Sequence, residues 1–88
     1  MQWYRIKQIC PKDGVQKPVH KSMQNRICQI VDIRVGRRGL LRVDVGDKLI
    51  GPHRIVISKV VRVYRTEEDN DITIETENTI YYLEKCYS

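Results

Sequence analysis

Two adjacent arginines flanked by glycines form the most chemically suggestive motif of this sequence, Gly36-Arg37-Arg38-Gly39. A guanidinium group presents its N–H donors in a planar fork that fits phosphate or carboxylate oxygens, and the glycines allow the backbone to turn and to approach a partner closely. Arg34 and Arg42 flank the motif on the same outward face of a predicted hairpin. These four arginines are therefore predicted to bind a polyanion. The alternative is that the glycines serve the turn and the arginines are only solvated.

A second group of cations lies between Pro11 and Arg26. This segment has few apolar side chains, and its Asp13-Gly14 and Pro18 are typical of turns and loops. We expect residues 11–26 to be a basic loop or arm that attracts a nucleic-acid backbone through charge, with a solvated loop as the alternative. Its cationic or imidazole side chains are Lys12, Lys17, His20, Lys21 and Arg26.

Other cations and rings are more scattered. A third cationic group belongs to one long apolar run and consists of His53, Arg54, Lys59, Arg62 and Arg65. Its members alternate between the two faces of a strand, so they are not expected to form one patch. Base stacking needs exposed rings beside positive charge, and the candidate rings are Trp3, Tyr4 and Tyr82, for which burial is the alternative.

Acidic residues gather near the end of the chain. Residues 1–65 hold fifteen of the sixteen Lys and Arg and four acids, a balance of +11, whereas residues 66–88 hold one lysine and seven acids, a balance of −6. This asymmetry predicts a polyanionic partner for the basic part, electrostatic pairing within the fold, or both. The acids that could imitate DNA on a basic protein surface are Glu67, Glu68, Asp69, Asp71, Glu75 and Glu77.

Patterns for catalysis and metal binding are weak. No nucleophile motif surrounds any serine or cysteine. His20 and His53 with a lysine would suit a two-histidine ribonuclease, but two histidines are close to what chance supplies. Cys10, Cys28 and Cys86 are an odd number without a close pair, so we expect reduced thiols. The sequence predicts no enzymatic activity, no metal site and no cofactor.

Length and hydropathy bound the class of protein. A chain of 88 residues supports one hydrophobic core, so residues 1–88 are expected to form a single domain. Its apolar runs are far shorter than the roughly 20 residues of a membrane-spanning helix, and residues 1–10 have no signal-peptide core. A cytoplasmic protein that does not enter the membrane is predicted.

Alternating apolar residues predict that strands position these side chains. Two strands are expected over 31–35 and 41–45, with Val35 opposite Leu41. The run 54–65 has apolar residues on both faces, which predicts a bulge near Ser58-Lys59 and one strand serving two parts of a barrel. A Glu77-Asn78 turn would place Ile74 opposite Tyr81 and Ile72 opposite Leu83.

The remaining elements are short. Residues 3–9 are expected to form an edge strand, residues 22–26 a helical turn, and residues 48–50 a short strand or a bent linker. Together these elements predict a mostly β fold with five to seven short strands and at most one helical turn. We expect a small, partly open antiparallel barrel of the SH3-like or OB-like kind, because closure removes exposed edges.

Three segments carry a resemblance to known proteins: Gly46 to Leu49, Val60 to Val63 and Thr76 to Leu83. Over roughly residues 40–84 the chain resembles small β-barrel proteins encoded by phages and mobile elements, which include inhibitors of host defence such as anti-CRISPR proteins. The resemblance implies a small barrel and a binding role. It transfers no site residue, and the 36–40 hairpin and the basic arm lie outside it.

These features predict a non-catalytic binding module, monomeric or homodimeric. The first interpretation is that the basic hairpin and arm engage nucleic acid or a nucleoprotein complex. The alternative is a protein-binding inhibitor whose acidic hairpin occupies a basic surface of a host protein.

Overall fold

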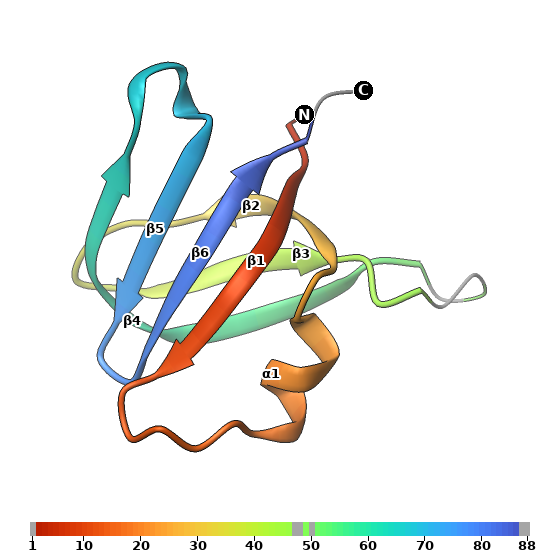
Figure 1. Cartoon of the computed structure of the whole chain (residues 1–88), viewed down its shortest axis with the longest axis horizontal. Helices are drawn as coiled ribbons and strands as arrows, with labels where there is room; N and C mark the ends of the chain where they lie inside the picture. The colour runs from red at the N-terminus through yellow and green to blue at the C-terminus, as the bar shows by residue number, and fades with distance from the viewer. Residues whose placement is uncertain (1, 47–48, 50, 87–88) are drawn as a thin grey trace.

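The chain folds into a closed barrel of six antiparallel strands, seen in a computed structural model that describes residues 2–46, 49 and 51–86 (Figure 1). Each strand pairs with the next along the chain, and the last pairs with the first. The predicted small, mostly β, antiparallel barrel is confirmed. Its elements are β1 (Tyr4–Pro11), α1 (Pro18–Met23), β2 (Ile27–Asp32), β3 (Arg38–Val43), β4 (His53–Arg65), the 3-10 turn η1 (Glu67–Asp69), β5 (Asp71–Thr76) and β6 (Thr79–Lys85).

The seam between β1 and β2 is the shortest contact of the barrel. Only Tyr4↔Cys28 and Arg5↔Ile27 pair there, whereas β1 pairs with β6 along nearly its whole length. Beyond the ladder, the Ile6 N–H donates to Arg26 O at 2.8 Å. The predicted edge strand at the N-terminus is therefore wrong, because β1 has a neighbour on both sides.

Inward-facing side chains of all six strands fill the barrel. Tyr4, Ile6 and Ile9 of β1 all point inward, because a register irregularity between Ile6 and Gln8 resets the alternation. The other buried hydrophobic residues are Met23, Cys28, Leu41, Val43, Ile57, Val60, Ile72, Ile74, Tyr81 and Leu83. No helix in the described part of the chain is long and apolar enough to cross a membrane.

The long strand β4 bends as the sequence predicts. Its first part pairs with β3 and its second part with β5, so one strand serves two parts of the barrel. The register of β4 against β3 shifts between Val56 and Lys59, and the register of β4 against β5 shifts between Val60 and Arg62. These bulges let β4 curve around the core while keeping apolar side chains inside.

The β5–β6 hairpin also has the predicted register, with Ile72 opposite Leu83 and Ile74 opposite Tyr81. The buried Thr76 side chain holds the Glu77-Asn78 turn. Its Oγ1 accepts the Thr79 N–H at 3.0 Å and donates to Thr79 O at 3.0 Å. Neither Glu77 nor Asn78 has a positive φ, so this turn does not require a glycine.

The β2–β3 connection differs from the prediction. Leu41 lies opposite Ile30 and Val43 opposite Cys28, so the expected strand over residues 31–35 is wrong. Val35 is 64% exposed, and the Gly36 N–H donates to Val60 O on β4 at 2.8 Å. The 36–39 motif therefore lies against β4 and is not a free hairpin tip.

Gly39 explains why the register moves. It is buried, and a Cβ there would come within 2.6 Å of Ile33 Cδ1 and 2.8 Å of Ile57 Cγ1. Ile33 thus packs over the bare Gly39 backbone, which it could not do from the predicted strand position. The glycine serves internal packing within β3, which is neither of the two roles, in a turn or beside a partner, that the sequence predicts.

Substitution of Gly39 by alanine should destabilise the barrel. The added methyl overlaps two side chains, and we expect a loss of about 1–3 kcal/mol in the free energy of unfolding, measured by urea denaturation. Ile33→Val removes the nearest atom, Cδ1, and should restore part of this loss. A double variant as unstable as Gly39→Ala alone would contradict the packing explanation.

Residues 11–26, expected as a loop or arm, contain a helix that lies at one end of the barrel (Figure 1). The helix covers Pro18–Met23 and not 22–26, because Pro18 stands in its first turn and the Lys17 N–H donates to His20 Nδ1 at 3.2 Å. His20 and Met23 are 6% and 1% exposed. The segment is therefore anchored to the core. The predicted element at Lys48 to Ile50 lies largely outside the described residues.

Candidate nucleic-acid interface

The outward face of β3 carries alternating cationic and apolar side chains. Arg38, Leu40 and Arg42 point outward, while Leu41 and Val43 are buried in the core. Both arginines are exposed. Two of the four arginines predicted to bind a polyanion, Arg38 and Arg42, are therefore held on a strand.

The neighbouring strand β4 repeats the same order of side chains. Arg54 pairs with Arg42 and Lys59 pairs with Arg38, so that two cations stand directly opposite two cations. Between these two pairs, Val56 lies opposite Leu40 and is 54% exposed. We call the four residues Arg38, Arg42, Arg54 and Lys59 the cation ladder.

Neighbouring oxygens orient both arginines of β3. Arg42 Nη1 donates to Gln29 Oε1 at 3.2 Å, and Arg38 Nε donates to Ile57 O at 3.4 Å. A guanidinium has five N–H donors, so the others remain for a partner.

No residue of the cation ladder forms an ion pair with an acid in the part of the chain that the structure describes, and the acid beside it, Glu77, meets Lys59 through its backbone N–H. Like charges directly opposite each other destabilise a sheet, and here this happens twice within one pair of strands. The ladder is thus an unbalanced positive surface on a rigid support.

The sequence did not assign Arg54 or Lys59 to the site, because strict alternation places them on opposite faces. The register shift between Val56 and Lys59 brings both to the outward side of the β3–β4 pair. The sequence does predict a bulge near Ser58-Lys59, which is part of the information needed to place these two cations. Only the pairing partners show which cations it brings together.

The other predicted arginines of the hairpin lie in the loop before β3. Arg34 Nε is 3.3 Å from Asp32 Oδ1, so its charge is partly balanced. Arg37 is exposed, and its carbonyl accepts the Val60 N–H at 2.8 Å. Both residues precede Arg38 at one end of the cation ladder.

The predicted basic residues of the 11–26 segment are dispersed. Lys17 lines a pocket at the end of the barrel, and Lys21 is exposed on α1. Arg26 lies beside Gly46, where a Cβ would come within 2.9 Å of Arg26 Nη1. Since Gly46 follows β3, Arg26 lies near the end of that strand that carries Arg42.

The acids at the end of the chain mostly face cations of the same molecule. Arg5 Nη2 is 2.6 Å from Glu84, Lys7 Nζ is 3.3 Å from Asp71, and Lys12 Nζ is 2.7 Å from Glu75. The hydrogen bond from Lys12 lowers the pKa of Glu75. Asp69 is 3.8 Å from Arg65, while Glu67 and Glu68 are exposed in η1. Many of the acids near the end of the chain are therefore neutralised by cations of the same molecule, which is one of the two interpretations of the charge asymmetry.

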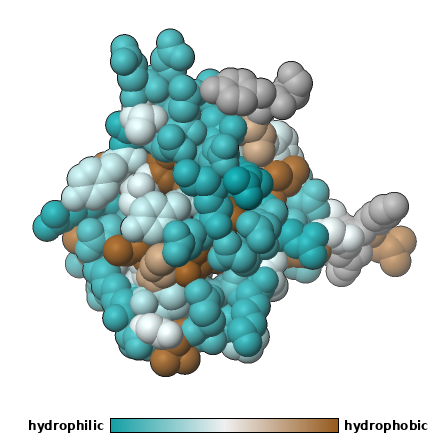
Figure 2. Space-filling model, in the orientation of Figure 1, coloured by the Kyte–Doolittle hydropathy of each residue, from teal (hydrophilic) through white to brown (hydrophobic). Residues whose placement is uncertain are grey.

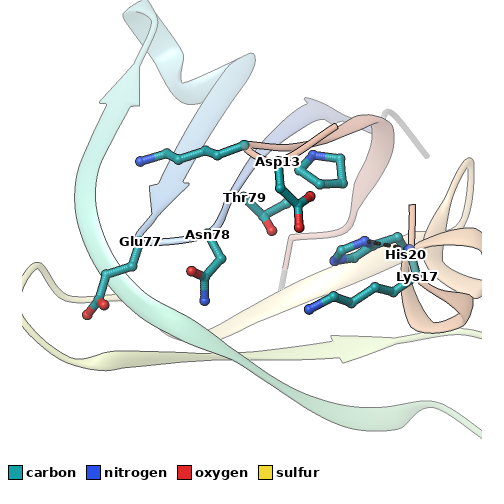
Figure 3. A pocket seen from close by; sticks show the side chains of 8 residues that line it. Asp13, Lys17, His20, Glu77, Asn78 and Thr79 are labelled. Atoms are coloured by element: carbon teal, nitrogen blue, oxygen red, sulfur yellow. Dashed lines mark hydrogen bonds between the residues drawn. The ribbon is translucent and has the colours of Figure 1, made fainter. Parts of the chain in front are cut away.

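A pocket of about 250 Å³ lies between the α1 segment and the β5–β6 turn (Figure 3). Lys17 and His20 face it from one side, and Glu77 and Asn78 from the other. The remaining lining residues are Pro11, Lys12, Asp13 and Thr79. It mixes both signs of charge, so it does not extend the cation ladder, and His53 is not among its lining residues.

His20 is held neutral in this pocket. Burial and the nearby Lys17 lower its pKa below the usual 6.5, against a smaller opposite effect from Asp13. Because the Lys17 N–H donates to Nδ1, the neutral ring carries its proton on Nε2.

This pKa shift predicts a pH dependence of stability. The unfolded chain takes up a proton on His20 more readily than the folded chain does. Neutral His20 therefore makes its full contribution to the free energy of unfolding above pH 6.5, and this contribution is lost as the pH falls through the folded-state pKa. Denaturation between about pH 7 and pH 5 should show this slope, and His20→Gln should flatten it. An equal slope in both proteins would contradict the assignment to His20.

The three cysteines are free thiols in the structure. Cys28 is fully buried in the core, and burial raises its pKa to about 12. It acts there as a small apolar side chain. Among the described residues, no group of three His, Cys, Asp or Glu side chains is placed to hold a metal ion.

The fold buries one of the tyrosines predicted to stack on bases and leaves another on the outward face. Tyr4, one of those candidates, is 7% exposed and belongs to the core. Tyr82 lies on the outward face of β6, as the sequence predicts, opposite Thr73 of β5. Tyr64, which the sequence analysis did not single out, is 54% exposed on the outward side of β4.

Comparison with known proteins gives no match to a family model, to a curated protein or to a solved structure.

Proposed function

We propose that this protein is a non-catalytic nucleic-acid-binding module and that the cation ladder contacts the phosphate backbone. The observation that carries the proposal is the double opposition of like charges, Arg42 to Arg54 and Arg38 to Lys59, without a neutralising acid in the described part of the chain. Such pairs lower the stability of a sheet. An anionic partner would turn this unfavourable arrangement into a favourable one.

The dimensions of the ladder suit a linear polyanion. Arg42 follows Arg38 by four positions along β3, which corresponds to about 13 Å along the strand. Arginine binds phosphate through two parallel N–H donors. Between the two cation pairs, the half-buried Leu40 and the exposed Val56 offer an apolar contact for a sugar.

The alternative, a protein-binding inhibitor that presents its acids as a DNA mimic, has less support from the geometry. Asp71, Glu75 and Glu84 each face a cation of β1 or of the turn after it. A DNA mimic requires unpaired negative charge, and here the hairpin face is close to neutral. Of the six acids predicted to imitate DNA, those for which the structure gives no ion pair are Glu67 and Glu68 in η1 and Glu77 in the β5–β6 turn.

Fluorescence anisotropy with labelled single strands and duplexes of about 20 nucleotides tests the proposal. If all four cations contact phosphates, raising the salt from about 50 to about 200 mM should weaken duplex binding ~100-fold and single-strand binding ~50-fold. The absence of any binding at the lower salt concentration would overturn the proposal.

A further inference from the structure

Two tyrosines on the outward face of the barrel flank a small side chain. In the β4–β5–β6 pairing, Tyr64 lies opposite Thr73, and Thr73 lies opposite Tyr82. We call Tyr64, Thr73 and Tyr82 the tyrosine row. In Figure 2, pale, ring-shaped side chains lie on the face that β4, β5 and β6 form in Figure 1.

The rings are presented for contact. Tyr64 is 54% exposed, and Arg62 Nη1 donates to its hydroxyl oxygen at 3.2 Å. Tyr82 is half-buried against the sheet. The two strands that carry the rings lie two strand spacings apart, about 10 Å, and the short side chain of Thr73 stands between them in the register.

The charges around the row are largely balanced. Lys7 pairs with Asp71 and Lys12 pairs with Glu75 on the same face. The row therefore gives little attraction for phosphate by itself. A planar, nearly neutral ligand that offers a stacking face fits it better.

Strand β4 joins the tyrosine row to the cation ladder. Lys59 belongs to the ladder, and Arg62 and Tyr64 follow it on the outward side of the same strand, paired with Glu75 and Thr73 of β5. A chain whose backbone lies on the ladder can thus continue along β4 and place its bases over the row. A nucleic acid supplies both chemistries, phosphate for the ladder and flat bases for the rings.

We infer that Tyr64 and Tyr82 are stacking sites for unpaired bases and that the protein binds single strands in preference to duplexes. This inference rests on the proposed function and deepens it. A duplex keeps its bases stacked inside, so it can use the cation ladder but not the tyrosine row. Stacking is largely independent of base identity, so weak sequence preference is expected.

The test compares three probes of equal length: an oligothymidylate strand, a strand of the same length that consists of abasic sites, and a duplex. The wild-type protein should bind the oligothymidylate on the order of tenfold more tightly than the abasic strand. Tyr64→Ala/Tyr82→Ala should remove this difference and leave duplex binding unchanged. Tyr64→Phe/Tyr82→Phe keeps the rings and should behave as the wild type.

The outcomes separate the two proposals. Equal wild-type affinity for the oligothymidylate and the abasic strand would overturn the stacking inference and leave the ladder proposal intact. Absence of binding to all three probes would overturn both. A double alanine variant that keeps its thermal midpoint and its preference for thymidylate would also overturn the stacking inference, since the fold would be intact and the rings unused.

Discussion

Arg42→Glu/Arg54→Glu should reduce the affinity for single and double strands by about 100-fold or more. Hydrogen bonds to charged groups contribute about 1.5–3 kcal/mol each, and the variant removes two cations and adds two repulsive anions. The slope of the logarithm of affinity against that of salt concentration should fall from about −3.6 to about −1.8 for a duplex. Anisotropy titrations at several salt concentrations measure both quantities.

The same positions predict an opposite effect on stability. Arg54→Glu alone places an acid directly opposite Arg42, so the free energy of unfolding should rise by about 0.5 kcal/mol while binding weakens. A substitution that raises stability and weakens binding is expected where a functional surface is unfavourable for folding. If Arg54→Glu lowered stability and left binding intact, the pair would be structural and the ladder proposal would lose its basis.

Lys17→Glu/Lys21→Glu is the matched control. It lowers the formal net charge from +5 to +1, as the ladder variant does, but it changes the α1 segment. Binding should be largely retained if the ladder is the contact surface. An equal loss in both variants would show that overall charge, and not the β3–β4 face, controls the affinity.

Met23→Ala should lower the free energy of unfolding by about 2–5 kcal/mol. Met23 is 1% exposed and belongs to the core cluster, so its removal leaves a cavity where α1 meets the end of the barrel. For a domain whose total stability is typically about 5–15 kcal/mol, this is a large fraction. Urea denaturation followed by circular dichroism measures the loss.

Val19→Ala serves as the comparison on the same helix. Val19 is 43% exposed, and its truncation should change stability by less than about 0.5 kcal/mol. Similar small effects for both variants would mean that the segment is a loosely attached arm, as the sequence suggests. A large effect at Met23 alone confirms that the helix is part of the core.

Much of the fold follows from local alternation. In the β5–β6 hairpin, a two-residue turn leaves one register that puts Ile72, Ile74, Tyr81 and Leu83 on the same face, and the structure has that register. The bend of β4 is visible as a change of alternation near Ser58. The β2–β3 register could not be obtained in this way, because it depends on Ile33 and Ile57 packing over Gly39.

The sequence predicts the kind of site, a basic surface, but not all of the residues that form it. The sequence indicates a basic, non-acidic stretch and places Arg42 correctly on the outward face, whereas Arg38, predicted at a hairpin tip, lies on β3. It omits Arg54 and Lys59 because a bulge changes their faces. It also gives Arg34 and Lys17 the same weight, whereas the fold places Arg34 beside Asp32 and Lys17 at the pocket.

The sequence by itself determined the strand-rich class, the position of most strands and the separation of charge along the chain, because these depend on residue type and on neighbours within one strand. Only the tertiary structure decided which charges meet. Barrel closure brings β1 beside β6, where the acids of the last hairpin neutralise Arg5, Lys7 and Lys12. The β3–β4 pairing puts Arg42 opposite Arg54, on the part of β4 that pairs with β3 and not with the acid-bearing β5. Electrostatic energy depends on distances between strands, and these are fixed only when the barrel closes.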